Sequence, residues 1–195
     1  MESQTRERII EAAVELFNFR GYRNVTLAEI AEHLGISKKT IYQFFTGKDE
    51  IAEGVLCFLS TKMNSKIREI KDLNLDPAIK LREIIKLSRT GLSKINPLFL
   101  EDIRKYIPNL EEELKKIKQE RIFLFEAIVR EGQAMGTFRS DIDARLAAIT
   151  YYEILLSVHN PAIITRLGGY SPEHSVDQVT DFLLEVYLKG ISNHH

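Results

Sequence analysis

Apolar residues along the chain recur mostly at intervals of three and four positions, the spacing that places side chains on one face of an α-helix. Ile9, Ala12, Ala13, Leu16 and Phe17 form the first such stripe. The sustained alternation of apolar and polar residues that indicates β-strands is missing. The pattern therefore predicts an all-α protein.

Two short helices are predicted directly after the first. Thr26 and Glu29 have the spacing of a capping box, in which each side chain satisfies a backbone amide of the other residue. Gly35 is expected to end this helix, and Ser37 to cap a second one that continues through Phe45. Two short helices joined by a glycine turn are the pattern of a helix-turn-helix motif.

Longer helices are predicted for the remaining residues. One runs to about Lys71, a second begins at Pro77, and a third begins at Asn109 with late turns that are nearly apolar. A further helix is expected over Leu146 to about Leu167, where Pro161 kinks or divides it. Residues 176–191 are predicted to form the last helix, which is amphipathic with one apolar face.

Charge and composition narrow the possible functions. The 195 residues carry 27 Lys and Arg against 28 Asp and Glu, so any affinity for nucleic acid must come from a local patch. Such a patch lies between His33 and Lys48, where three lysines stand without an acidic residue. The longest apolar run, Val55–Leu59, is far shorter than the roughly 20 residues of a membrane span. We expect a cytoplasmic protein with no membrane contact, and a lone Cys57 that lies in the core.

The N-terminal quarter carries a more specific pattern. It reads Ile9-x-x-Ala12-Ala13-x-x-x-Phe17-x-x-x-Gly21-Tyr22, then Thr26-x-x-x-Ile30-Ala31-x-x-Leu34-Gly35-Ile36-Ser37-x-x-Thr40-Ile41-Tyr42-x-x-Phe45-x-x-Lys48. Over about residues 5–56 this pattern closely resembles the DNA-binding domain of the TetR family of transcriptional repressors. Two positions depart from the family pattern, since many members carry Gly in place of Lys39 and Ser or Asn in place of Gly47.

The resemblance implies an all-α homodimer and a division of labour along the chain. A three-helix helix-turn-helix DNA-binding domain over residues 1–47 would bind a palindromic double-stranded DNA operator. A larger helical ligand-binding and dimerisation domain over residues 48–195, joined by the helix that starts near residue 48, would bind a small molecule that releases the DNA.

The second motif helix and its flanks supply the expected DNA contacts. Its first two turns can reach base edges in the major groove, while hydroxyl and ammonium groups at helix starts can donate to phosphates. The predicted DNA-binding residues are Thr26, Ser37, Lys38, Lys39, Thr40, Tyr42, Gln43 and Lys48. Four of them have a plainer interpretation: Tyr42 packs against the first helix, the two adjacent lysines are an ordinary solvent-exposed face, and Thr26 is only a cap.

Effector contacts are expected between the helices that follow the DNA-binding domain, and dimer contacts on the surface of the last two helices. Aromatic residues of the helices over residues 77–160 favour a small hydrophobic or amphipathic effector. The candidates are Phe99, Tyr106, Phe123, Phe125, Tyr151, Tyr152 and His159, and the same side chains are equally able to fill an ordinary core. The last two helices predict a four-helix dimer interface, with Phe182, Val186 and Tyr187 as candidate contacts.

Two other functional classes compete with a repressor. The first is a helical small-molecule sensor or carrier that has lost operator binding. The second is an α-helical enzyme, which finds little support because the chain has no phosphate-binding glycine loop, nucleophile elbow or metal-spaced His and Cys cluster. We therefore expect no catalytic residues, no cofactor and no metal site.

Overall fold

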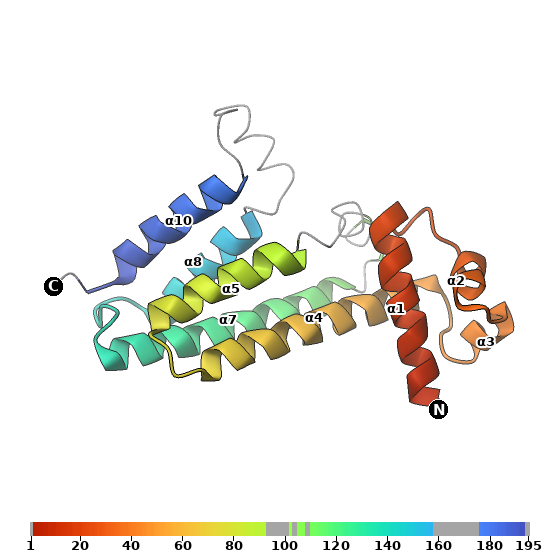
Figure 1. The fold of residues 1–195 in the computed structure, drawn as a ribbon, viewed down its shortest axis with the longest axis horizontal. Helices are drawn as coiled ribbons and strands as arrows, with labels where there is room; N and C mark the ends of the chain where they lie inside the picture. Colours follow the sequence, from red (N-terminus) through yellow and green to blue (C-terminus); the bar gives the residue numbers. More distant parts are fainter. Residues whose placement is uncertain (1, 93–101, 103–104, 108–109, 158–175, 194–195) are drawn as a thin grey trace. The chain divides into compact units, whose positions relative to one another are not determined.

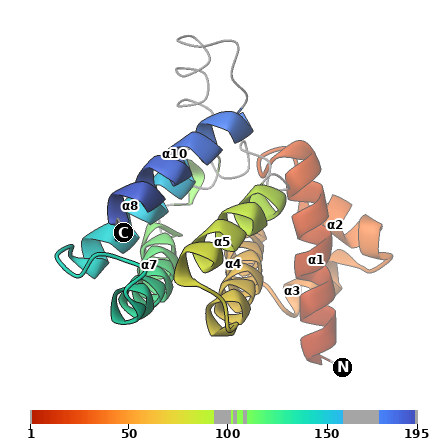
Figure 2. The same cartoon turned by 60° about the vertical axis from the view of Figure 1, so that its left-hand side comes forward.

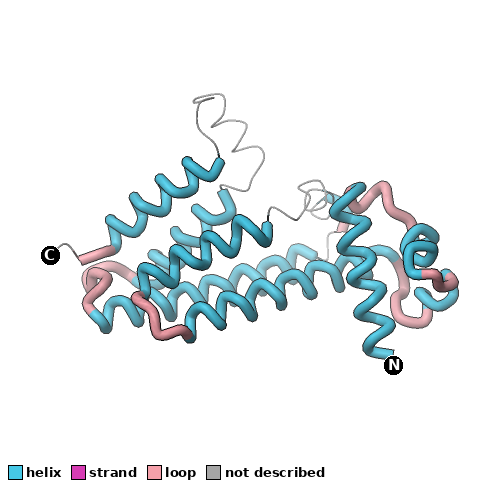
Figure 3. Tube along the Cα trace, in the orientation of Figure 1, coloured by secondary structure: helices cyan, strands magenta, loops and turns pink. Residues whose placement is uncertain are grey.

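The structure, a computed structural model, describes residues 2–92, 102, 105–107, 110–157 and 176–193 (Figures 1 and 3). These residues form helices and turns, with an isolated bridge between Phe138 and Ser192 as their β-type contact. The helices are α1 (Glu2–Arg20), α2 (Leu27–Leu34), α3 (Lys38–Tyr42), α4 (Lys48–Asp72), α5 (Pro77–Leu92), α7 (Leu110–Met135), α8 (Ala144–Ser157) and α10 (Val176–Ile191). The predicted all-α class, with a helix-turn-helix domain followed by a larger helical domain, is confirmed.

The chain divides into two compact units. The first comprises residues 1–63 and 94–115, and the second comprises residues 64–93 and 116–195. Helices α4 and α7 each continue from one unit into the other. Within the described part of the chain, no helix combines the length and apolar character needed to cross a membrane.

The core of the first unit holds α1, α2 and α3 together. Ile9, Ala13 and Phe17 of α1 are fully buried, as are Ile30 of α2 and Ile41 of α3. Helix α1 contacts α2, and α2 contacts α3, so the three helices form one packed group (Figure 2). Burial of this shared apolar face fixes the angle between the two motif helices.

Local signals set the ends of the motif helices. Gly35 takes a left-handed conformation with φ of 65° after α2, which residues with a side chain rarely adopt. Helix α3 ends at Tyr42 and not at the expected Phe45. The reason is a tighter turn, in which the Gln43 and Phe44 amides donate to carbonyls three residues back at 3.2 and 3.0 Å.

The exposed position of Cys57 corrects the expectation that it belongs to the core. Ile51, Val55 and Leu56 of α4 are buried. Because successive residues of an α-helix are about 100° apart, Cys57 points away from Val55 even though it has apolar sequence neighbours. The helix expected from Leu146 to about Leu167 begins at Ala144, and its expected kink at Pro161 and its expected end lie outside the described residues.

Aromatic and glycine contacts organise the second unit. The Phe125 and Tyr151 rings meet edge to face with centroids 4.7 Å apart. Helices α8 and α10 lie side by side (Figure 2), and the Tyr187 hydroxyl donates to the carbonyl of Ala147 at 2.8 Å. A Cβ atom at Gly132 would lie 2.1 Å from the ring of Phe138, so glycine at this position allows that ring to be buried.

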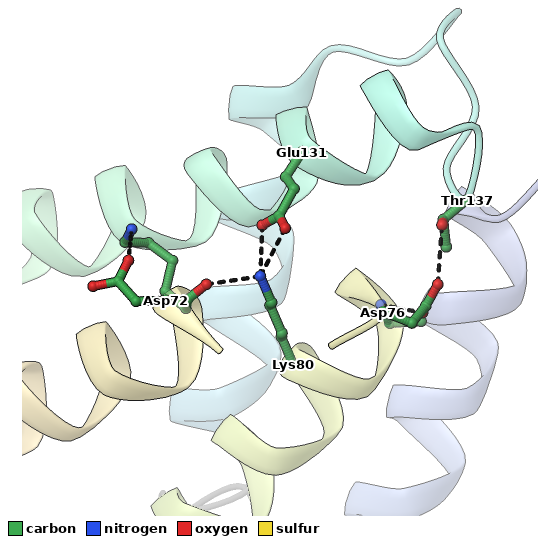
Figure 4. Close-up of polar contacts among 7 residues, drawn as sticks. Asp72, Asp76, Lys80, Glu131 and Thr137 are labelled. Carbon is green, nitrogen blue, oxygen red and sulfur yellow. Dashed lines mark hydrogen bonds and ion pairs between the residues drawn. The ribbon is translucent and has the colours of Figure 1, made fainter. Parts of the chain in front are cut away.

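A buried lysine joins three helices at one end of the second unit (Figure 4). Lys80 of α5 is 2% exposed, and its ammonium donates to the Lys71 carbonyl at 2.7 Å and to both Glu131 carboxylate oxygens at 2.7 and 2.9 Å. Asp76, just before α5, accepts a hydrogen bond from the Thr137 hydroxyl at 3.0 Å. These bonds tie the end of α4, the start of α5 and the last turns of α7 together.

Candidate nucleic-acid interface

Helix α3 presents a polar face to solvent. Lys38, Lys39, Tyr42 and Gln43 are exposed, and Tyr42 is 56% exposed, while Ile41 is fully buried. Positions 38, 39, 42 and 43 are separated by three and four residues, so they lie on the same side of the helix. Two ammonium groups, an amide and a phenol therefore stand together on the helix that the sequence predicts to enter the major groove.

Two predicted DNA-binding hydroxyls take part in starting α3. Ser37 is the N-cap residue, and its Oγ accepts a hydrogen bond from the Thr40 amide at 3.1 Å. The two hydroxyl oxygens lie 3.0 Å apart, so Ser37 and Thr40 also bond to each other. These contacts fix where α3 begins and hence which residues occupy its exposed face.

The predicted capping box at the start of α2 is present. The Thr26 amide and hydroxyl donate to Glu29 Oε2 at 2.7 and 2.8 Å, and the Glu29 amide donates to Thr26 Oγ1 at 3.3 Å. Arg20, the last residue of α1, pairs with the other Glu29 oxygen at 2.6 Å. The bonds from the Thr26 amide and hydroxyl, followed by the charge of Arg20, lower the pKa of Glu29.

The lowered pKa of Glu29 predicts how this cap depends on pH. Its contribution to stability is fully present above the ordinary carboxyl pKa near 4.5 and is lost as the pH falls through the lower folded-state pKa. Glu29→Gln is therefore expected to lower the melting temperature at about pH 7, and its difference from the wild type should shrink towards about pH 3. Glu32→Gln, an exposed change on the same helix, is the control. A difference that stays constant over this range would contradict the assignment.

Lys48 has a role inside the first unit that the sequence does not indicate. Its ammonium donates to the carbonyls of Tyr22 and Val25 at 3.0 and 2.9 Å and lies 4.2 Å from the centre of the Tyr22 ring. Burial lowers the pKa of Lys48, while the carboxylates of Asp49 and Asp102 raise it. The side chain thus holds the start of α4 against the loop between α1 and α2, and its contact with phosphate stays a prediction.

Asp102 and Tyr106 add a second contact to the same loop. The Arg23 amide donates to Asp102 Oδ2 at 3.1 Å, and the Arg23 guanidinium lies 4.9 Å from the centre of the Tyr106 ring. Ile107 and Leu110 are buried in the core that also contains α1, α2 and α3. Tyr106, a candidate effector contact, thus packs within the first unit and is 40% exposed.

The other candidate effector residues fall into three groups. Phe125, Tyr151 and Tyr152 are buried close together in the second unit, with Phe125 and Tyr152 centroids 6.4 Å apart. The Tyr151 hydroxyl donates to the Leu81 carbonyl at 2.6 Å. Phe123 is 67% exposed, and Phe99 and His159 lie outside the described residues.

The candidate dimer residues lie on two faces of α10. Phe182 and Val186 are 67% and 53% exposed, and Leu146 of α8 is 64% exposed. Tyr187 is 7% exposed, because its ring packs inward against Tyr151 and its hydroxyl bonds to α8. The solvent-facing apolar set of these two helices is therefore Leu146, Phe182 and Val186.

Comparisons with known proteins agree with this architecture. Residues 9–55 match the family described as bacterial regulatory proteins, tetR family. The chain is 25% identical over 198 residues to the HTH-type transcriptional repressor KstR2 of Rhodococcus jostii (strain RHA1), which covers 100% of this chain and 94% of that protein.

Solved structures resemble the whole fold. The fatty acid degradation regulator FadR from Bacillus halodurans has a TM-score of 0.74 at 20% identity, covering 95% of this chain and 98% of that one. The transcriptional regulator FadR from Bacillus subtilis, solved in complex with stearoyl-CoA, has a TM-score of 0.69 at 21% identity, covering 95% of this chain and 98% of that one.

Among the described residues, no group of three or more His, Cys, Asp or Glu side chains is arranged to hold a metal ion.

Proposed function

Because the chain belongs to the TetR family of transcriptional regulators, we propose that it is a dimeric, sequence-specific repressor released from its operator by a small molecule. The family consists of regulators and not of enzymes. The observation that carries the proposal is the exposed polar face of α3, which lies within a stretch without acidic residues, His33 to Lys48. Such a face provides local attraction to DNA in a chain whose net charge is −1.

DNA recognition is divided between base edges and backbone. Base edges are read by Lys38, Lys39 and Thr40 of α3 and by Gln43, the residue directly after it. Tyr42, Thr26 and Lys48 contact phosphates, and Ser37 caps the recognition helix. Two copies related by a dimer axis would place their α3 helices in successive major grooves roughly 34 Å apart, so the operator is an inverted repeat.

The effector acts from the larger helical domain. We assign residues 1–47 to DNA binding and residues 48–195 to effector binding and dimerisation. The apolar surroundings of Phe125, Tyr151 and Tyr152 favour a hydrophobic or amphipathic effector. Stearoyl-CoA, with which the Bacillus subtilis regulator was solved in complex, is an amphipathic molecule of this kind. Helix α4 is continuous from its start at Lys48, where it holds the α1–α2 loop, to Asp72. A ligand that favours one position of α4 would shift the populations of DNA-binding and released states.

Dimerisation covers the solvent-facing apolar set Leu146, Phe182 and Val186 in a four-helix arrangement, two helices from each copy. An apolar set at two adjacent helices is the kind of surface that isologous dimers bury. Light scattering of the purified protein checks this assembly, because a species that stays at 22.5 kDa is a monomer.

A gel-shift assay with the DNA upstream of the protein's own gene tests the function. The wild-type protein is expected to bind this DNA at least about a thousandfold more tightly than a scrambled duplex of equal length. Tyr42→Phe should weaken binding to both duplexes by a similar small factor, because it removes a hydroxyl that carries no sequence information. Equal affinity of the wild type for the two duplexes would refute the repressor and favour the sensor or carrier without operator binding.

A further inference from the structure

Arg121 occupies a position of α7 that the helical pattern assigns to an apolar residue. It stands four residues after Ile117 and four before Phe125, on the stripe that continues to the buried Ile128. The Arg121 side chain is partly buried, and its Nε donates to Oδ1 of Asn64 at 3.2 Å. Asn64 is itself only 2% exposed, so the guanidinium reaches into the interior of the second unit.

The acceptors around the Arg121 guanidinium are neutral. They are the Asn64 amide oxygen and the Tyr152 hydroxyl, and Tyr152 is 5% exposed. Burial lowers the pKa of Arg121, although Tyr152 and Glu120 oppose this effect. A guanidinium in such surroundings remains charged and lacks the anionic partner that usually accompanies a buried cation.

The neighbouring carboxylates are neutralised by other cations. Glu120 pairs with Arg68 and accepts a hydrogen bond from the Asn64 amide at 2.8 Å. Glu153 pairs with Lys118 at 2.5 Å. Within the described residues, no carboxylate forms an ion pair with Arg121. Among these described residues, the two acids Glu120 and Glu153 are outnumbered by three bases, which are Arg68, Lys118 and Arg121. The group therefore carries one positive charge more than its carboxylates neutralise.

We infer that Arg121 binds the acidic group of the effector, which is an apolar molecule that carries a carboxylate or a phosphate. Tyr152, whose hydroxyl bonds to the guanidinium, and Phe125, one helical turn after Arg121 on α7, have ring centroids 6.4 Å apart and supply apolar rings for the rest of the molecule. A guanidinium suits both acid types because its planar fork donates two parallel hydrogen bonds to either. The inference rests on the proposed effector-responsive function and specifies the chemical class of the effector.

Calorimetric titration with matched amphiphiles tests this assignment. Alkyl carboxylates from octanoate to hexadecanoate, the corresponding alkyl phosphates and the corresponding alcohols present equal tails with different head groups. For the tail that binds best, the carboxylate or the phosphate is expected to bind at least about tenfold more tightly than the alcohol. The tighter of the two acids identifies the head group. Alcohols that bind as tightly as the acids, or acids that do not bind at about 1 mM at any length, would overturn the inference.

Variants locate the effect at Arg121. Arg121→Gln should abolish the preference for acids over alcohols. Arg130→Gln, an exposed arginine on the same helix that pairs with Glu126 at 2.7 Å, should retain it. Retention of the preference in Arg121→Gln, with an unchanged circular dichroism spectrum, would overturn the assignment.

A second variant tests the uncompensated charge. Asn64→Asp places a carboxylate 3.2 Å from the guanidinium nitrogen, but it also replaces the amide that donates to Glu120 at 2.8 Å, so it is combined with Glu120→Gln. Relative to Glu120→Gln alone, the double variant is expected to melt a few degrees higher and to bind the acids more weakly. A lower melting temperature with unaltered acid binding, both relative to Glu120→Gln, would refute the inference. Operator binding in the gel shift is measured separately, so a repressor whose effector is uncharged is distinguished from a protein that does not bind DNA.

Discussion

Replacing Lys80 by methionine is expected to lower the free energy of unfolding by about 3 kcal/mol at neutral pH. The Lys80 side chain is 3% exposed, and its ammonium satisfies both carboxylate oxygens of Glu131 and the carbonyl of Lys71. Methionine retains the length of the Lys80 side chain up to Cε but lacks the ammonium, so these acceptors are left without a donor. Because the Glu131 side chain is 36% exposed, water can hydrate part of its charge, which keeps the loss at the lower end of the range for broken buried pairs.

Urea unfolding at a fixed protein concentration measures this effect, and two further variants define its origin. Lys66→Met, at an exposed position of α4, is the matched control and should change the free energy of unfolding by no more than about 0.5 kcal/mol. Lys80→Met combined with Glu131→Leu should recover at least half of the loss, because the unpaired carboxylate is then absent. Similar losses at Lys80 and Lys66 would show that the buried contact does not stabilise the second unit.

Sequence reasoning was accurate where the determining contacts are local. The cap of α2 joins Thr26 and Glu29, three residues apart, and the cap of α3 joins Ser37 and Thr40 at the same spacing. Their partners lie within one helical turn, so residue type and spacing alone specify the geometry. The left-handed residue between these helices, Gly35, was predictable for the same reason.

Contacts between distant positions were not predictable in this way. Lys48 reaches carbonyls of residues 22 and 25, and the Arg23 amide reaches Asp102, which is 79 positions further along the chain. Nothing in the local pattern around Lys48 distinguishes an ammonium directed to a protein carbonyl from one that faces solvent. The inward position of Tyr187 also depends on a partner on another helix, since its hydroxyl bonds to Ala147.

Arg121 is an intermediate case, because the sequence carried a signal for it. An arginine in the apolar stripe of a long helix is either a side chain that extends to solvent or a cation that needs a buried partner. The spacing from Ile117 to Phe125 was sufficient to raise this question. Only the structure showed the neutral acceptors, Asn64 and Tyr152, around it.

The largest functional effect is expected at the exposed face of α3. Changing both Lys38 and Lys39 to glutamate should reduce affinity for the operator by at least about 100-fold at moderate salt concentration. A dimer loses four cations at the DNA surface and gains four anions there, so the dependence of log K on log salt should fall by roughly four counterions. Both side chains are exposed, so the melting temperature should change little.

A control variant separates this local role from the net charge of the protein. Lys115→Glu with Lys116→Glu changes two adjacent exposed lysines of α7 and alters the net charge by the same amount. Operator affinity of this control should fall by no more than about fivefold, because neither lysine belongs to the helix-turn-helix motif and exposed charges that do not contact the DNA are screened at moderate salt. Equal losses in the two double variants would mean that overall charge governs DNA binding, and α3 would then not be the recognition helix. A loss confined to the Lys38 and Lys39 variant would show that this face of α3 recognises the operator sequence. The single change Lys39→Ala should then weaken the free energy of binding to the cognate operator by about 1–3 kcal/mol and relax the base preference at one base pair in each half-site.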